Sequence, residues 1–301
     1  MNRMPFPFVG LFLACLAAQA AVAGEIEDQA RAIMEQNQHA VVTVQVTTKT
    51  QVSFMGMGNE ESEDKREVTG TVIQPDGLTV VALSATDPTS MFHAMMGEMM
   101  EQMEMNARVI DVKILRDGGT EIPAAVVLRD KDLDLAFIRP IEKPAQPMAC
   151  IPLANAGSTS MLDEVVALNR LGKVANRAYA AYLLRIHAIV SKPRTYYVPS
   201  YEAMSTQGSP VFTADGKLLG LAVLRTLSEG GSEASGLAAM LSGGMTGNMI
   251  PIILPASDIL EVAAQAPESG EAAVEESAAE EAAPGEAVEE VQKVEESGPA
   301  S

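Results

Sequence analysis

Short apolar segments rich in β-branched residues recur along the chain, and they constrain its fold more than any other feature. The first spans residues 40–46, and two more at 68–73 and 78–83 flank a Pro75-Asp76-Gly77 turn that is typical of a hairpin. Many short strands at this spacing predict an all-β sandwich or barrel rather than alternating strands and helices. The further segments, most of them separated by Gly, Pro or Asp, lie at 109–115, 124–128, 135–138, 164–168, 181–190, 210–213 and 218–224.

Helices are expected only at the two ends of this β-rich region. Residues 25–38 carry a few apolar positions among polar ones and predict a short lead-in helix. After a last strand at 251–255, residues 256–265 predict a closing helix with Ser257 or Asp258 as its N-cap. The polar, charged segment from Gly56 to Arg66 predicts a loop.

The first 23 residues have the composition of a secretory signal peptide. Arg3 supplies a positive start, residues 6–16 are apolar, and Ala21-Val22-Ala23 forms a cleavage site before Gly24. No other segment approaches 18 consecutive apolar residues, so no stable membrane span is expected. We therefore expect an exported bacterial protein, periplasmic or otherwise extracytoplasmic.

The two cysteines predict no disulfide framework. Cys15 lies within the apolar signal segment, and the residues before it fit a lipoprotein signal poorly, so we expect it to be removed. Cys150 then remains alone in an apolar context, which is typical of a small buried residue. No cofactor is expected.

Acidic residues concentrate at the C-terminus. The formal net charge is −19, and residues 266–301 hold 11 Glu and one Lys among mostly Ala, Ser, Gly, Pro and Val. Because so few apolar side chains cannot offset the entropy of ordering, this tail is predicted to be disordered. The acidic charge also argues against a nucleic-acid partner. The sequence thus divides into a signal peptide (1–23), a folded domain (24–265) and an acidic tail (266–301).

Five segments of the predicted domain match, in order, those of one protease family. Together they resemble the protease domain of HtrA/Deg-type serine proteases, which implies an all-β, two-barrel chymotrypsin/trypsin-like fold over roughly residues 40–265. Each segment alone is weak evidence, but the order of all five is specific. They are 68–77 (VTGTVIQPDG), 132–138 (DLDLAFI), 151–156 (IPLANA), 165–169 (VVALN) and 205–211 (STQGSPV), the last followed by an Asp215-Gly216 turn.

The same resemblance assigns the catalytic triad to Ser84, Asp134 and Gln207. Asp134 matches the aspartate of the family, whereas Ser84 stands at the position of the histidine and Gln207 at that of the nucleophilic serine. A triad needs a hydroxyl nucleophile, an imidazole base and a carboxylate that orients the imidazole. Ser205 and Ser209 also replace glycines of the loop that forms the oxyanion hole. The resemblance therefore implies a degenerate triad, in which Asp134 packs and hydrogen-bonds, with Ser84 as the expected partner.

Another serine could in principle replace the missing nucleophile. In this alternative, Ser205 or Ser209 attacks and His93 or His187 acts as base, which would make the chain an atypical active endopeptidase. His187 lies in an apolar predicted strand and His93 in an apparent insertion, where a structural or surface histidine is the commoner case.

Methionine dominates an insertion between Ser84 and the strand at 109–115. On a helix, most of its large apolar side chains fall on one half of the circumference, opposite Glu98, Glu101 and Glu104. Such a face suits the domain's own core, an adaptable surface for an unfolded or partner polypeptide, or a Cu(I) site made of thioethers. The candidate peptide-binding residues are Met91, Phe92, Met95, Met96, Met99, Met100 and Met103.

These features together favour an exported pseudoprotease that binds unfolded or partner polypeptide, with a role in envelope protein quality control. The active endopeptidase and a Met-rich copper-binding envelope protein remain the alternatives.

Overall fold

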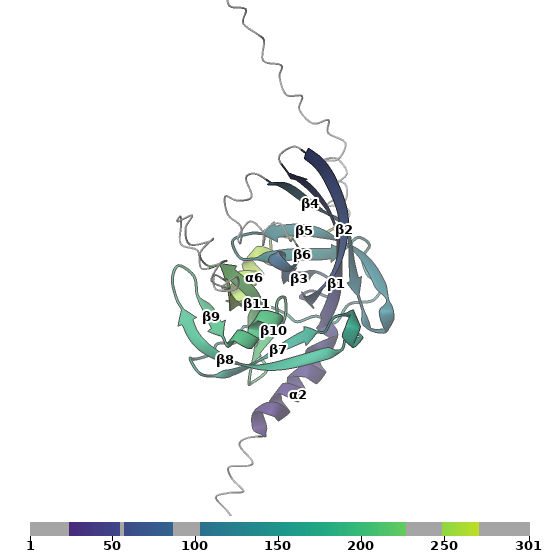
Figure 1. Ribbon diagram of the computed structural model, residues 1–301. Coiled ribbons are helices and arrows are strands. Elements are labelled where there is room, and N and C mark those ends of the chain that lie inside the picture. The colour runs from purple at the N-terminus through teal and green to yellow at the C-terminus, as the bar shows by residue number, and fades with distance from the viewer. Residues whose placement is uncertain (1–23, 55–56, 87–102, 227–248, 271–301) are drawn as a thin grey trace, which may run out of the picture.

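The computed structural model describes residues 24–54, 57–86, 103–226 and 249–270, and these form two closed barrels of six strands each (Figure 1). The prediction of an all-β, two-barrel fold is confirmed. In the described part of the chain, no helix has the length and apolar character needed to cross a membrane.

The first barrel closes in the order β1-β2-β3-β6-β5-β4, with each neighbouring pair antiparallel where pairing is defined. Its interior is filled by small and medium side chains, half of them valine, in a chain that has no tryptophan. The strands are β1 (Val41–Phe54), β2 (Met57–Val72), β3 (Thr79–Ala82), β4 (Met103–Leu115), β5 (Glu121–Asp130) and β6 (Leu135–Pro140).

The second barrel closes in the order β10-β11-β12-β9-β8-β7. The predicted segments at 164–168, 181–190, 210–213, 218–224 and 251–255 all lie in its strands, while β9 was not predicted. The strands are β7 (Glu164–Arg170), β8 (Tyr179–Val190), β9 (Tyr196–Pro199), β10 (Pro210–Thr213), β11 (Leu218–Thr226) and β12 (Met249–Pro255).

A third apolar cluster joins the two barrels. Successive side chains of a strand point to opposite faces, so Ile138 fills the first barrel while Phe137 faces the second. Likewise Val211 fills the second barrel and Phe212 faces the first. Both faces of β6 and β10 are therefore buried along the whole strand, and this double burial fixes the two barrels against each other.

Both predicted terminal helices are present. Helix α2 (Glu25–Asn37) packs Ile33 into the cluster between the barrels, and α6 (Ala256–Ala263) adds Ile259. The predicted cap at Ser257 or Asp258 is wrong, because the helix already begins at Ala256 with Pro255 as N-cap. Short helical turns complete the domain at η1 (Gln38–Ala40), α3 (Leu83–Thr86), η3 (Asp117–Gly119), η4 (Lys173–Ala175) and η5 (Tyr201–Ser205).

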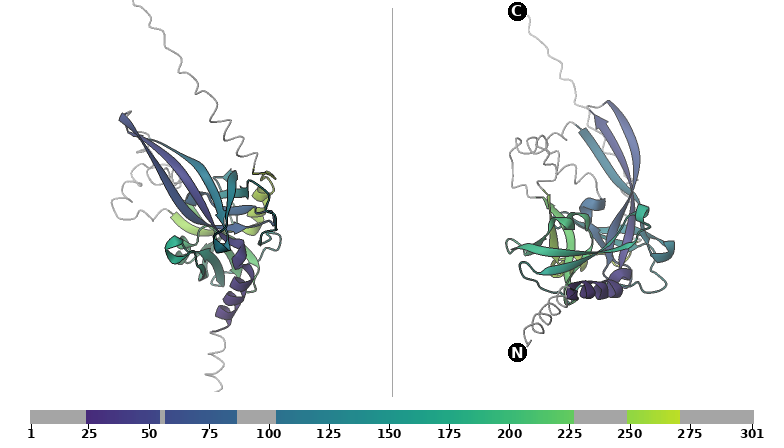
Figure 2. Two further views of the ribbon diagram at one scale, coloured as in Figure 1. Left: turned by 90° about the vertical axis from the view of Figure 1, so that its right-hand side faces the viewer. Right: turned by 60° about the horizontal axis from the view of Figure 1, so that its bottom comes forward.

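The predicted loop from Gly56 to Arg66 is wrong, since residues from Met57 onward belong to β2. This strand pairs with β1 from Val41↔Thr71 to Phe54↔Met57, and β4 pairs with the other edge of β1. The three strands project beyond the barrel as an antiparallel arm (Figure 2, left). Cross-strand contacts such as the Lys49–Glu61 ion pair (2.8 Å) show how charged residues that suggest a loop are accommodated on an exposed sheet.

The predicted methionine helix cannot extend through Met103, because Met103 begins β4 and pairs with Phe54. Strand pairing across the arm overrides the local helical pattern at this end. The remaining candidates from Met91 to Met100 lie outside the described residues, as do the signal peptide and residues 271–301. Ala266 packs against the core and Gly270 is buried near Pro140, so these first residues of the predicted tail contact the domain.

Candidate functional site

Asp134 and Ser84 lie together at the end of the first barrel that faces the second. Asp134 precedes β6 and adopts a left-handed backbone with φ 57°, and its carbonyl accepts a hydrogen bond from the Leu83 N–H (2.9 Å). Its carboxyl accepts the Ser84 N–H (2.6 Å) and the Ser84 hydroxyl (2.8 Å). The hydrogen bond expected between these two residues is therefore present.

The carboxyl of Asp134 also contacts the second barrel. The Leu224 N–H of β11 donates to Oδ2 at 3.3 Å. Burial raises the pKa of Asp134, and the hydrogen bonds from Ser84 and Leu224 offset this only in part. A serine hydroxyl does not accept a proton near neutral pH, so this pair contains a carboxyl but no general base.

Gln207 lies in the tight turn between η5 and β10. Its side-chain amide donates to the Met204 carbonyl at 3.2 Å, and an amide nitrogen or oxygen does not attack a peptide carbonyl as a hydroxyl does. The backbone N–H groups of Thr206, Gly208 and Ser209 donate to carbonyls of Ala203, Ala222 and Thr206 respectively, at 2.8–3.0 Å. These three amides are thus committed to the structure of the loop itself.

Gly208 brings this loop into contact with the first barrel. Its φ is +76°, and a Cβ built there would lie only 2.2 Å from the Thr69 carbonyl oxygen. The Thr71 hydroxyl donates to the Gly208 carbonyl at 2.9 Å. Only glycine combines this backbone conformation with so close an approach. Of the two serines that replace family glycines, neither has a positive φ.

A cleft of about 260 Å³ opens beside Gln207 between the barrels. One wall comes from the first barrel. It includes Thr43, which is buried, and the partly exposed Ala85, which follows Ser84 directly. The Thr43 hydroxyl has no hydrogen-bond partner in the described structure. The lining residues are Thr43, Glu67, Val68, Thr69, Ala85, Asn169, Arg170, Leu171, Gly172, Met204, Ser205 and Gln207.

Asn169 connects the two walls of the cleft. It is buried, its Nδ2 donates to the Ser205 carbonyl (2.7 Å), and its Oδ1 accepts the Arg170 N–H (2.6 Å) and the Thr69 hydroxyl. A buried amide with these bonds holds β2, the end of β7 and the loop of Gln207 in one arrangement. The sequence indicated Asn169 only as part of a matching segment, and this bridging role was not predicted.

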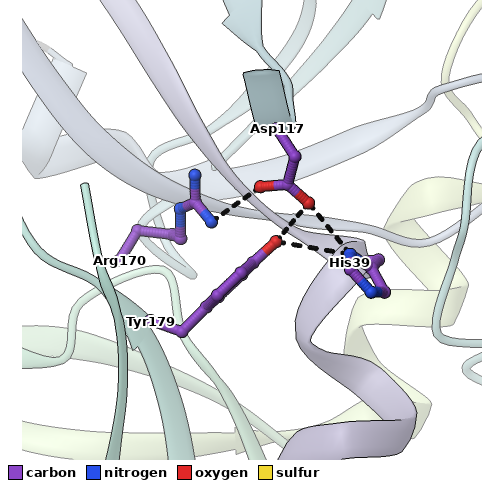
Figure 3. A network of polar contacts seen from close by, with 4 residues as sticks. All are labelled: His39, Asp117, Arg170 and Tyr179. Atoms are coloured by element: carbon purple, nitrogen blue, oxygen red, sulfur yellow. Dashed lines mark hydrogen bonds and ion pairs between the residues drawn. The ribbon is translucent and has the colours of Figure 1, made fainter. Parts of the chain in front are cut away.

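A second polar network, which the sequence did not indicate, joins the barrels nearby (Figure 3). Asp117 in η3 accepts hydrogen bonds from His39 Nδ1 (2.9 Å), Arg170 Nη1 (3.0 Å) and the Tyr179 hydroxyl. The Arg170 guanidinium also stacks on the Tyr179 ring, 4.0 Å from its centre. The four residues come from η1, η3, β7 and β8, so no local motif relates them.

Asp117 and Tyr179 influence each other's ionisation. Burial opposes ionisation of Asp117, but the hydrogen bonds from its three partners outweigh burial and lower the pKa of this carboxyl. Burial and the hydrogen bond to Asp117 raise the pKa of Tyr179 to about 12. The network therefore favours an ionised Asp117 carboxylate that accepts a hydrogen bond from the neutral Tyr179 phenol.

Replacing Tyr179 by phenylalanine is expected to remove an alkaline loss of stability. Since the pKa of Tyr179 is about 12 in the folded protein and about 10 in an unfolded chain, its contribution is complete below pH 10 and lost as the pH rises towards 12. The melting-temperature advantage of wild type over Tyr179→Phe should shrink between about pH 10 and about pH 12. Tyr201→Phe, which changes an exposed ring, is the control. An advantage that stays constant would contradict the prediction.

The displaced-serine arrangement is not seen among the described residues. Ser209 is fully buried, and its hydroxyl has no hydrogen-bond partner. Ser205 is exposed and donates to the Glu202 carbonyl at 2.9 Å, while His187 lies exposed on β8. Neither serine is hydrogen-bonded to a histidine of the described structure, and His93 lies outside it.

The described residues contain no group of three His, Cys, Asp or Glu side chains that could hold a metal ion. The thioether candidates between Met91 and Met100 lie outside them.

The fold agrees with the comparison to known families. A family model described as a trypsin-like peptidase domain matches residues 68–221, just over half of the chain. The chain therefore belongs to the trypsin-like peptidase domain family. Among solved structures, it is similar to the apo form of the MamO protease domain from Magnetospirillum magneticum, with 17% identity and a TM-score of 0.43. The alignment covers 75% of this chain and 96% of that one. No curated protein matches the sequence.

Proposed function

We propose that this trypsin-like domain is an exported pseudoprotease, which binds unfolded or partner polypeptide in the cleft beside Gln207 and does not cleave it. The observation that carries the proposal is the pairing of Asp134 with Ser84, because the carboxyl that would orient an imidazole is occupied by a hydroxyl and a backbone amide. Gln207 leaves the adjoining turn without a nucleophile.

Binding of polypeptide is supported by the walls of the cleft. The unpaired Thr43 hydroxyl is suited to a backbone amide or carbonyl of a bound chain, and Leu171 and Met204 supply apolar surface. Ala85 lies in α3, which ends at Thr86, and the methionine-rich segment follows α3 in the sequence. Its thioether side chains would extend the binding surface and adapt to different sequences.

The purified protein is expected to suppress aggregation of an unfolded client without cutting it and without reacting with a fluorophosphonate probe. Replacing Met95, Met96, Met99 and Met100 by serine should abolish the suppression while the melting temperature stays unchanged. Light scattering, gel electrophoresis and probe labelling measure the three properties. Met161→Ser, at an exposed methionine of the second barrel, is the matched control.

Three other outcomes would each reject part of the proposal. Unfolding of the four-methionine variant would assign that segment to the core. Unchanged suppression by a stable variant would remove it from the binding surface. Client cleavage, or labelling that disappears in Ser205→Ala, would show a displaced nucleophile, and stabilisation of the wild type by copper alone would favour the metal alternative.

Export is a separate part of the proposal. It predicts that protein secreted by a bacterial host begins at Gly24, because cleavage after Ala23 removes the apolar segment. Intact mass spectrometry of the secreted protein measures this directly. A lipid-modified protein beginning at Cys15, or an uncleaved chain, would contradict it.

A further inference from the structure

A second cavity, of about 340 Å³, lies near the cleft beside Gln207. The end of β7 and the β7–β8 connection contribute residues to both. One wall is the turn from β4 to β5 in the first barrel, and the other is the segment from Asn176 to Tyr179 with Arg170 in the second. Three arginines, Arg116, Arg170 and Arg177, line it. An anionic group is therefore the natural occupant by charge.

The arginines retain hydrogen-bonding capacity although two of them are paired. Arg170 is buried and bonded to Asp117, yet its Nε has no acceptor in the described structure. Arg177 forms a two-point ion pair with Glu67. Arg116 is exposed, and its side chain makes no hydrogen bond or ion pair with the described residues. A carboxylate entering the cavity would find guanidinium donors that the fold leaves open.

The surroundings of the cavity are basic in an otherwise acidic protein. Lys173 acts electrostatically on Glu67, and Lys65 acts on Glu121, which is ion-paired with Lys113. Among the charged residues that line the cavity, three are arginines and two, Asp117 and Glu121, are acidic.

The chain carries its own acidic segment within reach of this surface. Residues 271–301 hold ten Glu and one Lys. The described chain ends at Gly270, which packs on Pro140 and Ile141, and the Ile141 N–H donates to the carbonyl of Pro123 near the start of β5. A flexible chain of this length has a root-mean-square span of roughly 30 Å, so the cavity at the β4–β5 turn is accessible to it.

We propose that the acidic segment 271–301 folds back on its own domain and places glutamate carboxylates in the cavity lined by Arg116, Arg170 and Arg177. Covalent connection gives these carboxylates an effective concentration in the millimolar range, which favours them over a free acidic peptide. The proposal does not require the cleft to bind polypeptide, because the two cavities share only Arg170 among their lining residues.

Paramagnetic relaxation tests this contact in the chain from Gly24 to Ser301. A nitroxide is attached at Ser277→Cys in a Cys150→Ala background, and broadening of backbone amide signals is recorded. We expect selective broadening of Arg116, Gly118 and Gly119, which line the cavity, and none at Gly157 in a separate pocket of the second barrel. The broadening should disappear in about 0.5 M NaCl, where the screening length is roughly 4 Å.

Charge reversal at one arginine provides the specific control. Arg116→Glu should abolish the broadening, whereas Arg129→Glu, an equal charge change on the exposed part of β5 outside the cavity, should preserve it. Uniform broadening, or equal loss in both variants, would overturn the proposal. Broadening that arises only between spin-labelled and isotope-labelled molecules in a mixture would also overturn it, because the occupant would then be the tail of a second copy.

Discussion

Gly208→Ala is expected to lower the free energy of unfolding by about 2–4 kcal/mol, from the combined cost of a left-handed non-glycine residue and of steric overlap. Gly208 has a φ of +76°, and an added Cβ would lie 2.2 Å from the carbonyl oxygen of Thr69. This oxygen belongs to the backbone of β2, so it cannot move away as a flexible side chain would. Relief requires the loop of Gln207 to separate from the first barrel.

Urea unfolding followed by circular dichroism measures this loss, and Gly118→Ala separates its two causes. Gly118 also has a positive φ, +81°, but a Cβ there meets nothing within 4 Å. Gly118→Ala should therefore lower the free energy of unfolding by only about 1 kcal/mol, which is the conformational cost alone. Equal losses of unfolding free energy in the two variants would show that the steric contact at Gly208 adds nothing to the destabilisation.

Restoring the two missing side chains is expected to create a reactive serine. In Ser84→His combined with Gln207→Ser, the imidazole would occupy the position from which the Ser84 hydroxyl now reaches Asp134 Oδ2 at 2.8 Å. General-base catalysis contributes about 10²–10⁴-fold, so the double variant should react with a fluorophosphonate probe at least about 10²-fold faster than Gln207→Ser alone. The rate of covalent labelling is the measurement.

Asp134→Asn, added to the double variant, tests whether this carboxyl performs the orienting role. Without the carboxylate the imidazole loses its preferred tautomer, and the labelling rate should fall back towards that of Gln207→Ser alone. Labelling that does not depend on Asp134 would contradict the assignment of these positions. Failure of the double variant to react would locate a further defect in the loop, where the amides of Thr206, Gly208 and Ser209 already donate to other carbonyls.

The candidate site was only partly predictable. The segment 132–138 located Asp134, and counting from Gly77 located Ser84, because spacing along a strand and turn is preserved in the fold. The bridging bonds of Asn169 and the network of His39, Asp117 and Tyr179 were not predicted. Their members are up to 140 residues apart, and only the docking of two barrels brings them together.

The errors have a related cause. Polar and charged residues from Asn59 onward favour a loop when taken alone, yet β1 supplies a partner for β2 from Met57 to Thr71. Helical periodicity likewise extends to Met103, but pairing with Phe54 places that residue in β4. Local propensity is weaker than a continuous ladder of backbone hydrogen bonds, so the neighbouring strand determines the structure.

By itself the sequence determined the strand periodicity, the all-β class and the residue types at positions 84, 134 and 207, since these depend on local pattern and chemical identity. The resemblance of five segments predicted the two barrels, whereas the tertiary structure alone decided the arm of β1, β2 and β4 and the cavities beside Gln207 and Arg116. It also decided that the Asp134 carboxyl would be buried against Leu224. The physical reason is that burial, cavity shape and charge pairing depend on which distant segments pack together. The local sequence around a residue does not show which distant segments these will be.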